Sequence, residues 1–261
     1  MDYEHIGYTT VDDSIAVVTL NRPQRLNAIT PAVLLDLFDA AERIQSDPAI
    51  RVWLLTGAPR PDGRPCFSAG VDLKDAAEGG VRDPELGLRL ANLIDDMLTP
   101  SIAVIDGICT TGGGELAVSC DLRLVGEAAQ ISDWHLKNLG TGPGGWGSST
   151  RWARLVGAAK AKELFLTGKV MGAQEAYDCG FATSVHPSSS LMEDALVVAR
   201  QIAQMNPAGV RLTLAHIDHT RDMSRDEALR WVNTLREWFD MPLSRTDYAA
   251  RRRNILGEAD G

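Results

Sequence analysis

Three consecutive glycines followed at once by a glutamate are the feature of this 261-residue sequence that could most clearly do chemistry. Gly112, Gly113 and Gly114 stand before Glu115-Leu-Ala-Val-Ser-Cys120, which we expect to be helical. The first amides of a helix have no intrahelical acceptor, and the helix dipole favours negative charge there. Such a helix start can bind an anion or a developing oxyanion. Three glycines can equally mark a close packing contact or a sharp turn.

A second glycine turn lies earlier in the chain, in Cys66-Phe-Ser-Ala-Gly-Val-Asp-Leu73. Gly70 stands directly before Val71, and the backbone amide of Val71 could point into a cleft. Taken alone, this segment is a weak signal.

Alternating strand and helix patterns supply the elements that must position these turns. Runs rich in β-branched and apolar residues predict strands at 15–20, 52–56, 101–105, 122–125 and 181–185. Capping residues and helical spacing predict helices from Thr30-Pro31 onward, at 158–167 and at 173–179. Strands that alternate with helices indicate an α/β fold made of repeated β-turn-α units.

Strand patterns end near residue 190, and helical patterns at 191–205, 209–220, 224–239 and 247–255 follow. We therefore expect a core at residues 1–190 and a helical subdomain at 191–261. One predicted helix carries a large apolar face, which we expect to pack on the main domain or on another subunit. Its residues are Trp231, Leu235, Trp238 and Phe239.

Net charge and apolar runs restrict the class of partner. A formal charge of −9 argues against a non-specific nucleic-acid binder, because phosphate neutralisation needs a concentrated positive surface. The exception is Arg251–Arg253, which could face solvent, another subunit or the phosphates of an anionic cofactor. The apolar runs are too short for a bilayer and the start lacks a signal-peptide pattern. We expect no membrane partner and a cytoplasmic location.

Cysteine and histidine spacings indicate neither a metal nor a disulfide framework. The four cysteines lack paired CxxC spacing, and the five histidines lack an HExxH pattern. We predict no metal site.

Several motifs follow one another in a specific order: LNRP at 20–23, LNA at 26–28, FSAGVDL at 67–73, GGGELA at 112–117, CDLR at 120–123, LGTGPG at 139–144, LVG at 155–157 and LTG at 166–168. In this order they resemble the crotonase superfamily, also called the enoyl-CoA hydratase/isomerase family, over almost the whole chain. The resemblance implies an α/β fold with a crotonase-type ββα spiral core and a C-terminal helical subdomain. It also implies homotrimers or hexamers assembled through the C-terminal helices.

The resemblance assigns two backbone donors and one carboxylate to an acyl-CoA site. The amides of Val71 and Gly112 would hold the thioester oxygen, and Thr111 stands where relatives usually have a glycine. Two such preorganised donors would stabilise the enolate of an acyl-thioester. Glu115 matches the first of the two glutamates that flank a water in hydratases. Its alternative role is a simple complement to the helix dipole.

The position of the second glutamate is occupied by Leu136, which cannot transfer a proton. Asp133 and His135 are the neighbouring candidates, because histidine is a competent acid or base near neutral pH. A lone histidine beside tryptophan is as often structural. Related diketone hydrolases that cleave carbon–carbon bonds place histidine and aspartate in this region. Three alternatives remain open: an enoyl-CoA hydratase/isomerase-like lyase, a carbon–carbon bond hydrolase and a non-catalytic scaffold or binding protein.

The resemblance also implies where coenzyme A would dock as part of the substrate, with no tightly bound cofactor. The matching positions are Arg22, Arg25, Leu26, Ala28, Ala69, Asp72 and Leu73. Arg25 is a cation of the kind that phosphates attract, although a surface arginine without a ligand is equally common. Trp146 and Trp152 could line an acyl pocket, but large aromatic residues are more often part of a core.

Overall fold

The structure, a computed structural model, describes residues 3–79, 83 and 85–238 of the chain. The chain divides into two compact units, the first ending at Met205 and the second beginning at Asn206. The helix expected at 247–255 and the Arg251–Arg253 cluster lie outside the described residues.

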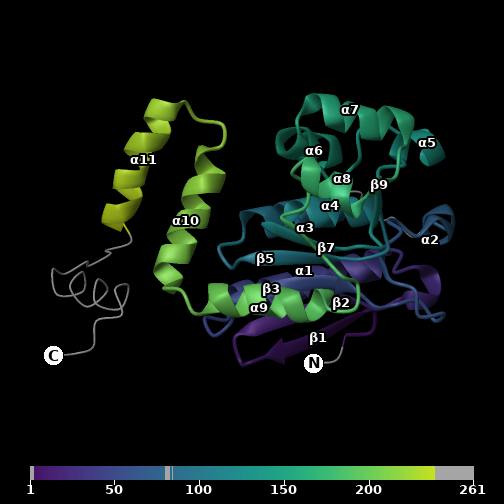
Figure 1. Cartoon of the computed structure of the whole chain (residues 1–261), viewed down its shortest axis with the longest axis horizontal. Helices are drawn as coiled ribbons and strands as arrows, with labels where there is room; N and C mark the ends of the chain where they lie inside the picture. Colours follow the sequence, from purple (N-terminus) through teal and green to yellow (C-terminus); the bar gives the residue numbers. More distant parts are fainter. Residues whose placement is uncertain (1–2, 80–82, 84, 239–261) are drawn as a thin grey trace. The chain divides into compact units, whose positions relative to one another are not determined.

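Two β-sheets organise the first unit (Figure 1). The larger sheet has the order β1 (Ile6–Val11), β2 (Ile15–Leu20), β3 (Val52–Gly57), β5 (Ser101–Ile105), β7 (Leu122–Gly126) and β10 (Ser184–His186). The smaller sheet has the order β4 (Cys66–Ser68), β6 (Ile108–Thr110), β8 (Gln130–Ser132) and β9 (Met171–Gly172). The pairs β1–β2 and β8–β9 are antiparallel, and the other pairs are parallel.

The chain alternates between the two sheets, and a helix follows each strand of the smaller sheet. Strands β3, β5 and β7 of the larger sheet lead to β4, β6 and β8 of the smaller sheet. The helices α2 (Leu73–Ala77), α4 (Gly112–Ser119) and α5 (His135–Leu139) follow β4, β6 and β8 respectively. The result is the ββα spiral that the family resemblance implies, and it brings the starts of successive helices to the smaller sheet.

The remaining helices cover the sheets or connect the turns of the spiral. In the first unit they are α1 (Pro31–Ser46), α3 (Leu86–Asp96), α6 (Ser148–Val156), α7 (Ala158–Thr167), α8 (Ala173–Asp178) and α9 (Leu191–Ala203), with a short 3₁₀ turn, η1 (Pro23–Arg25). The second unit contains α10 (Pro207–Thr220) and α11 (Arg225–Trp238). None of the helices in the described ranges combines the length and apolar character that a membrane crossing requires.

The larger sheet is buried on both faces, which explains why its strands are continuous apolar runs. In β3, Trp53 and Leu55 join the larger core cluster with α1 and α3. Val52 and Leu54 point to the opposite face and pack with residues of α9. Adjacent strand residues therefore serve two different cores, as the two-residue period of a strand requires.

Helix α9 lies within the first unit, although the sequence pattern suggested a boundary at residue 190. Its residues Leu191, Ala195 and Ala199 are buried against the larger sheet. For this reason the compact units divide after Met205.

The last strand is shorter and begins later than the sequence pattern suggested. Phe181 precedes β10 and is fully buried, with its ring stacked on Trp152 at a centroid distance of 4.5 Å. The apolar character of this segment reflects core packing before the strand.

Candidate active site

The glycine triplet allows α4 to begin in a crowded position. A Cβ atom on Gly113 would lie 2.8 Å from the Ser68 Cβ and from the Ser68 carbonyl oxygen. A Cβ atom on Gly112 would lie 2.8 Å from the indole of Trp146. The close packing expected of the triplet is therefore confirmed, and α4 begins at Gly112 within it. All eight residues of α4 are buried.

The two turns predicted to carry the backbone donors lie next to each other. A Cβ atom on Gly70, which has φ +85°, would lie 1.8 Å from Thr111 Oγ1 and 3.1 Å from the Gly112 nitrogen. The Gly70 amide donates to Ser68 Oγ, at 3.1 Å. The structure thus brings Val71, the residue after Gly70, beside the first residue of α4.

The amides of Val71 and Gly112 are not committed to a protein acceptor within the described residues. Within residues 3–79, 83 and 85–238, neither amide donates a hydrogen bond to a protein acceptor. The residues on either side of Val71 are held by Ile29: Ile29 N donates to Gly70 O at 2.7 Å, and Asp72 N donates to Ile29 O at 2.9 Å. The turn is therefore fixed while the Val71 amide stays uncommitted.

Thr111 enters α4 in an unusual backbone conformation, with φ 46° and ψ −119°. A β-branched residue rarely has positive φ, and such strain is common at functional sites. A glycine, which the family resemblance places at this position, would avoid the strain.

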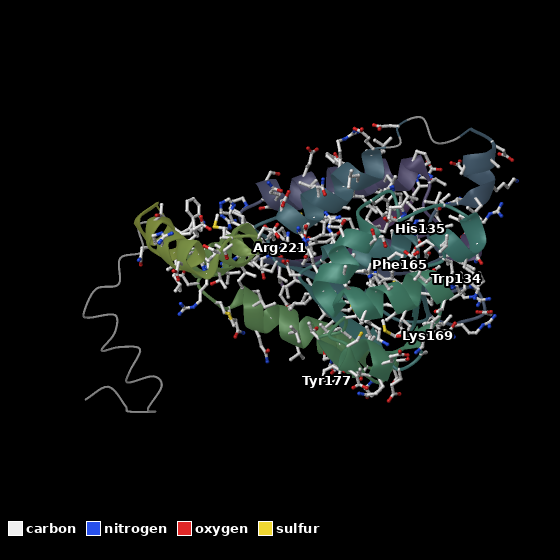
Figure 2. All side chains as sticks on the ribbon, turned by 90° about the horizontal axis from the view of Figure 1, so that it is seen from above. Trp134, His135, Phe165, Lys169, Tyr177 and Arg221 are labelled. Carbon is white, nitrogen blue, oxygen red and sulfur yellow. The ribbon has the colours of Figure 1, made fainter. Side chains whose placement is uncertain are left out.

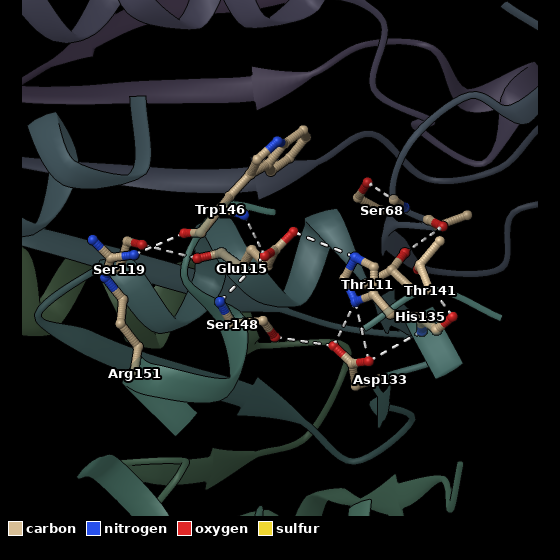
Figure 3. A network of polar contacts seen from close by, with 12 residues as sticks. Ser68, Thr111, Glu115, Ser119, Asp133, His135, Thr141, Trp146, Ser148 and Arg151 are labelled. Carbon is tan, nitrogen blue, oxygen red and sulfur yellow. Dashed lines mark hydrogen bonds and ion pairs between the residues drawn. The ribbon is translucent and has the colours of Figure 1, made fainter. Parts of the chain in front are cut away.

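Glu115 lies in the first turn of α4 and is almost completely buried. Its Oε1 atom accepts hydrogen bonds from the amides of Trp146 and Ser148, at 2.8 and 3.2 Å. Its Oε2 atom lies 3.6 Å from Nε2 of His135 (Figure 3). One oxygen is therefore fixed by the backbone, and the other faces an imidazole.

His135, the first residue of α5, is oriented by Asp133. Its Nδ1 atom lies 2.9 Å from Asp133 Oδ2 and 3.1 Å from Oδ1, and its backbone amide donates to Oδ1 at 3.1 Å. Asp133 also accepts a hydrogen bond from the hydroxyl of Ser148, at 3.0 Å. Aspartate, histidine and glutamate therefore form one buried series in which Nε2 of His135 faces Glu115.

His135, and not Leu136, occupies the place opposite Glu115. Leu136 is 43% exposed, whereas His135 is buried. The residue before His135 is Trp134, and Figure 2 labels both side chains. The indole N–H of Trp134 donates to Gly168 O at 3.1 Å. The anchored Trp134 and the Asp133 carboxylate thus hold the imidazole of His135 toward Glu115.

Burial and charge shift the acid–base properties of the pair. Burial raises the pKa of Glu115, although His135 and the two backbone amides act in the opposite direction. Burial alone would lower the pKa of His135, but the hydrogen bond and charge of Asp133 and the charge of Glu115 outweigh it and raise this pKa. Each shift favours the protonated form, but the causes differ: burial acts on Glu115, and neighbouring carboxylates act on His135.

The two tryptophans suggested as pocket residues have different surroundings. Trp152 is fully buried and stacks on Phe181, so it belongs to the core. The indole of Trp146 packs against Gly112 and Gly87, where a Cβ atom on Gly87 would lie 2.0 Å from the ring. Trp146 therefore lies beside the start of α4.

The residues proposed for coenzyme A lie on two adjoining segments. Arg22 pairs with Asp72 at 3.0 Å and donates to Ala28 O at 2.6 Å, so its charge is already compensated. The Ala69 amide donates to Leu26 O at 2.9 Å, which joins the segments. Two residues of the set are exposed, namely Arg25 and Leu73.

Sequence reasoning missed Ser148 and the backbone amide of Trp146. Both follow the glycine-rich turn that was identified as a motif, but nothing in the sequence distinguishes Ser148 from Ser149. The described residues contain no group of three or more histidine, cysteine, aspartate or glutamate side chains placed to hold a metal ion.

The fold and the site define an α/β spiral protein in which a buried carboxylate–imidazole pair lies near two amides that have no acceptor among the described residues. The sequence pattern of the enoyl-CoA hydratase/isomerase family matches residues 10–241. The chain belongs to this family and is an enoyl-CoA hydratase/isomerase-like enzyme.

Individual relatives cover nearly the whole chain. A Mycobacterium tuberculosis protein named "Probable enoyl-CoA hydratase" is 33% identical over 237 residues, covering 90% of this chain and 89% of the relative. The crotonyl-CoA hydratase of Syntrophomonas wolfei is 32% identical, covering 88% and 87%. The crystal structure of an enoyl-CoA hydratase from Bacillus anthracis superposes with a TM-score of 0.88 at 28% identity, covering 97% of each chain.

Proposed function

We propose that this enzyme adds water reversibly across the double bond of an enoyl-CoA thioester, with Glu115 and His135 as its acid–base pair. The observation that carries the proposal is the buried Glu115–His135–Asp133 series beside two uncommitted amides. Relatives named as hydratases add support.

The amides of Val71 and Gly112 would hold the thioester oxygen. As a water oxygen bonds to Cβ, its proton goes to Glu115 and the double-bond electrons move toward the carbonyl, which gives an enolate. Two preorganised N–H donors favour that enolate over the substrate, and this lowers the barrier.

The imidazolium of His135 would then protonate Cα and collapse the enolate. Glu115 has gained one proton and His135 has lost one, so transfer between Oε2 and Nε2 restores both groups. These atoms lie 3.6 Å apart, close enough for transfer after a small movement or through one water. His135 thus replaces the second glutamate that is missing at Leu136.

Coenzyme A would be bound as part of the substrate, without a tightly bound cofactor. Arg25 is exposed on the 22–28 segment and suits a phosphate, whereas Arg22 is paired with Asp72 and holds the binding loop. The adjoining residues Ala69 and Leu73 would complete the contact. We further propose that the C-terminal helices, from residue 191 onward, assemble a homotrimer or hexamer.

The His135–Asp133 pair favours one second candidate, hydrolysis of a carbon–carbon bond in a diketone. There a histidine would activate water, and the two amides would stabilise the enolate that leaves. The pair is compatible with this chemistry because Asp133 fixes Nδ1 and leaves Nε2 toward the site.

A substrate panel with matched variants tests the proposal. Crotonyl-CoA and longer enoyl-CoA thioesters would be assayed for hydration, and a cyclic diketone for cleavage. Glu115→Gln removes the base and should lower kcat for hydration by about 10³-fold or more, because general base catalysis contributes about 10²–10⁴-fold. Equal turnover by Glu115→Gln and wild type would rule out the assigned base.

His135→Gln and Leu136→Gln form a second matched pair on adjacent residues. We expect a loss of about 10²-fold in kcat for His135→Gln, because the acid is removed. Leu136→Gln should stay within about twofold of wild type, because surface changes away from specific contacts have small effects. Cleavage of the diketone without hydration of any enoyl-CoA would favour the second candidate.

A further inference from the structure

One serine contacts both carboxylates of the site. Ser148 is the first residue of α6 and is fully buried. Its amide donates to Glu115 Oε1 at 3.2 Å, and its hydroxyl donates to Asp133 Oδ2 at 3.0 Å (Figure 3). A single residue therefore connects the proposed base with the aspartate that orients the proposed acid.

The hydroxyl fixes the plane of the Asp133 carboxylate. The Oδ1 atom is held by the backbone amide of His135, and Oδ2 is held by Ser148. A planar group bound at both oxygens cannot rotate without breaking a buried hydrogen bond, and such bonds to a charged group are strong. His135 Nδ1 contacts the same carboxylate, so the position of the carboxylate also determines the orientation of the imidazole.

The glycine-rich turn before α6 is built to bring Ser148 this close. Gly144 has φ +83°, and a Cβ atom there would lie 2.5 Å from Ser148 Cβ and 2.7 Å from Glu115 Oε1. The next residue, Ser149, is only half-buried, and its amide donates to Pro143 O at 3.1 Å. Ser149 thus makes a turn contact, while Ser148 faces the ionisable groups.

We propose that Ser148 is a positioning residue that holds Asp133, and through it the imidazole of His135, in the orientation that presents Nε2 to Glu115. The inference deepens the proposed function and rests on it for its kinetic consequence. Its structural consequence is a change in the titration of the His135 imidazole, which can be measured without any substrate.

Ser148→Ala removes the hydroxyl and keeps the amide bond to Glu115. We expect kcat for enoyl-CoA hydration to fall about tenfold while KM changes by less than about twofold, because a hydrogen bond to a charged group is lost and substrate contacts remain. Ser149→Ala is the matched control on the adjacent residue and should keep wild-type kinetics.

The second readout is the imidazole of His135, followed by ¹⁵N and ¹H NMR titration of the free enzyme. Asp133 and Glu115 are the charged groups that act on His135 in the described structure. In Ser148→Ala the Asp133 carboxylate can rotate away, so the His135 pKa should fall relative to wild type and Ser149→Ala. An unchanged or raised pKa would overturn the proposal.

A double-mutant cycle separates positioning through Asp133 from a general packing role. If Ser148 acts through Asp133, adding Ser148→Ala to Asp133→Asn should lower kcat by less than about twofold more. Fully multiplicative losses would show that Ser148 acts independently and would overturn the proposal. If Ser148→Ala fails to fold, Ser148→Cys replaces the hydroxyl with a thiol, which is a weaker donor. The kinetics, the His135 titration and the double-mutant cycle would then be measured on Ser148→Cys. If no enoyl-CoA is turned over, the proposed function fails and the titration still decides the role of Ser148.

Discussion

At the scale of single residues, a shift of one position decides which side chain can complete the acid–base pair. The family resemblance places the second glutamate at Leu136, yet Leu136 is exposed and its neighbour His135 faces Glu115. A helix rotates by about 100° per residue, so adjacent residues face different directions. The imidazole of His135 therefore faces Glu115, although His135 stands one position before the residue at which the family resemblance places the second glutamate.

Replacing Asp133 should change the pH dependence in a defined direction. Asp133→Asn keeps the shape but removes the charge that raises the pKa of His135, so this pKa should fall. Because the proposed mechanism uses His135 as the acid, the basic limb of kcat/KM against pH should move to lower pH in the variant. The acidic limb should reflect Glu115, whose pKa lies above the usual value for glutamate because of burial.

The same shift has a consequence for stability. A histidine with a raised pKa in the folded state stabilises the fold fully below its unfolded pKa of about 6.5, and this contribution is lost as pH rises through the folded pKa. The difference in unfolding free energy between wild type and Asp133→Asn should accordingly shrink across that interval.

For the kinetic prediction, a basic limb of kcat/KM against pH that does not move in Asp133→Asn would contradict the role proposed for His135.

The sequence identified most members of the site but not their connections. Glu115, Asp133 and His135 were candidates by residue type and motif order, and the structure brings them together. Ser148 was missed, because its importance comes from two contacts across 15 and 33 residues of chain. A serine at a helix start has many ordinary explanations, so its pattern alone carries no such information.

At the scale of elements, the site depends on two loops that approach each other more closely than side chains normally permit. Gly70 ends the turn after β4 and meets Thr111 at the start of α4. The separation of the two free amides is thus set by the absence of a Cβ atom at one position.

Gly70→Ala should separate the two backbone donors. The added methyl would lie 1.8 Å from Thr111 Oγ1, so one loop must move. Since losing one oxyanion donor costs about 10²–10³ in kcat, we expect a loss of that order for enoyl-CoA hydration. The measurement is kcat together with the melting temperature.

Gly63→Ala provides the matched control for backbone strain. Gly63 also has positive φ, +80°, but nothing lies within 4 Å of its added Cβ atom. The unfavourable φ should cost each variant about 1 kcal/mol, while only Gly70→Ala should lose further stability from the clash and lose turnover. Equal loss of activity in both variants would show that strain, and not donor geometry, is responsible.

Long elements were predicted well from the sequence, and short ones were not. The strand Ile15–Leu20 and the helix Ala158–Thr167 have the predicted bounds. The three-residue strands β4, β6 and β8 contain too few residues to show a period, although they form the sheet next to the site. Their register depends on contacts between distant segments.

At the scale of the whole molecule, the position of α9 shows why composition alone misplaces a boundary. Strand patterns stop before this helix, yet its small residues lie directly on the larger sheet. Ala195 is fully buried there and contributes to a core that includes Val17, Leu54 and Ile102. Helix α9 therefore covers one face of the larger sheet and shares its core.

Ala195→Asp should test this integration in the full chain. A carboxylate at this position would be buried in an apolar cluster, so we expect a loss of about 3–5 kcal/mol in the free energy of unfolding. Val197→Asp is the control on the same helix, because Val197 is 46% exposed and the change should cost less than about 0.5 kcal/mol. Both variants would carry Trp231→Phe and Trp238→Phe, so that every remaining tryptophan lies in the first unit and the fluorescence change on denaturant unfolding reports on that unit. If α9 belonged to a separate helical subdomain, Ala195→Asp would leave that transition unchanged, whereas an integrated α9 requires that its midpoint fall.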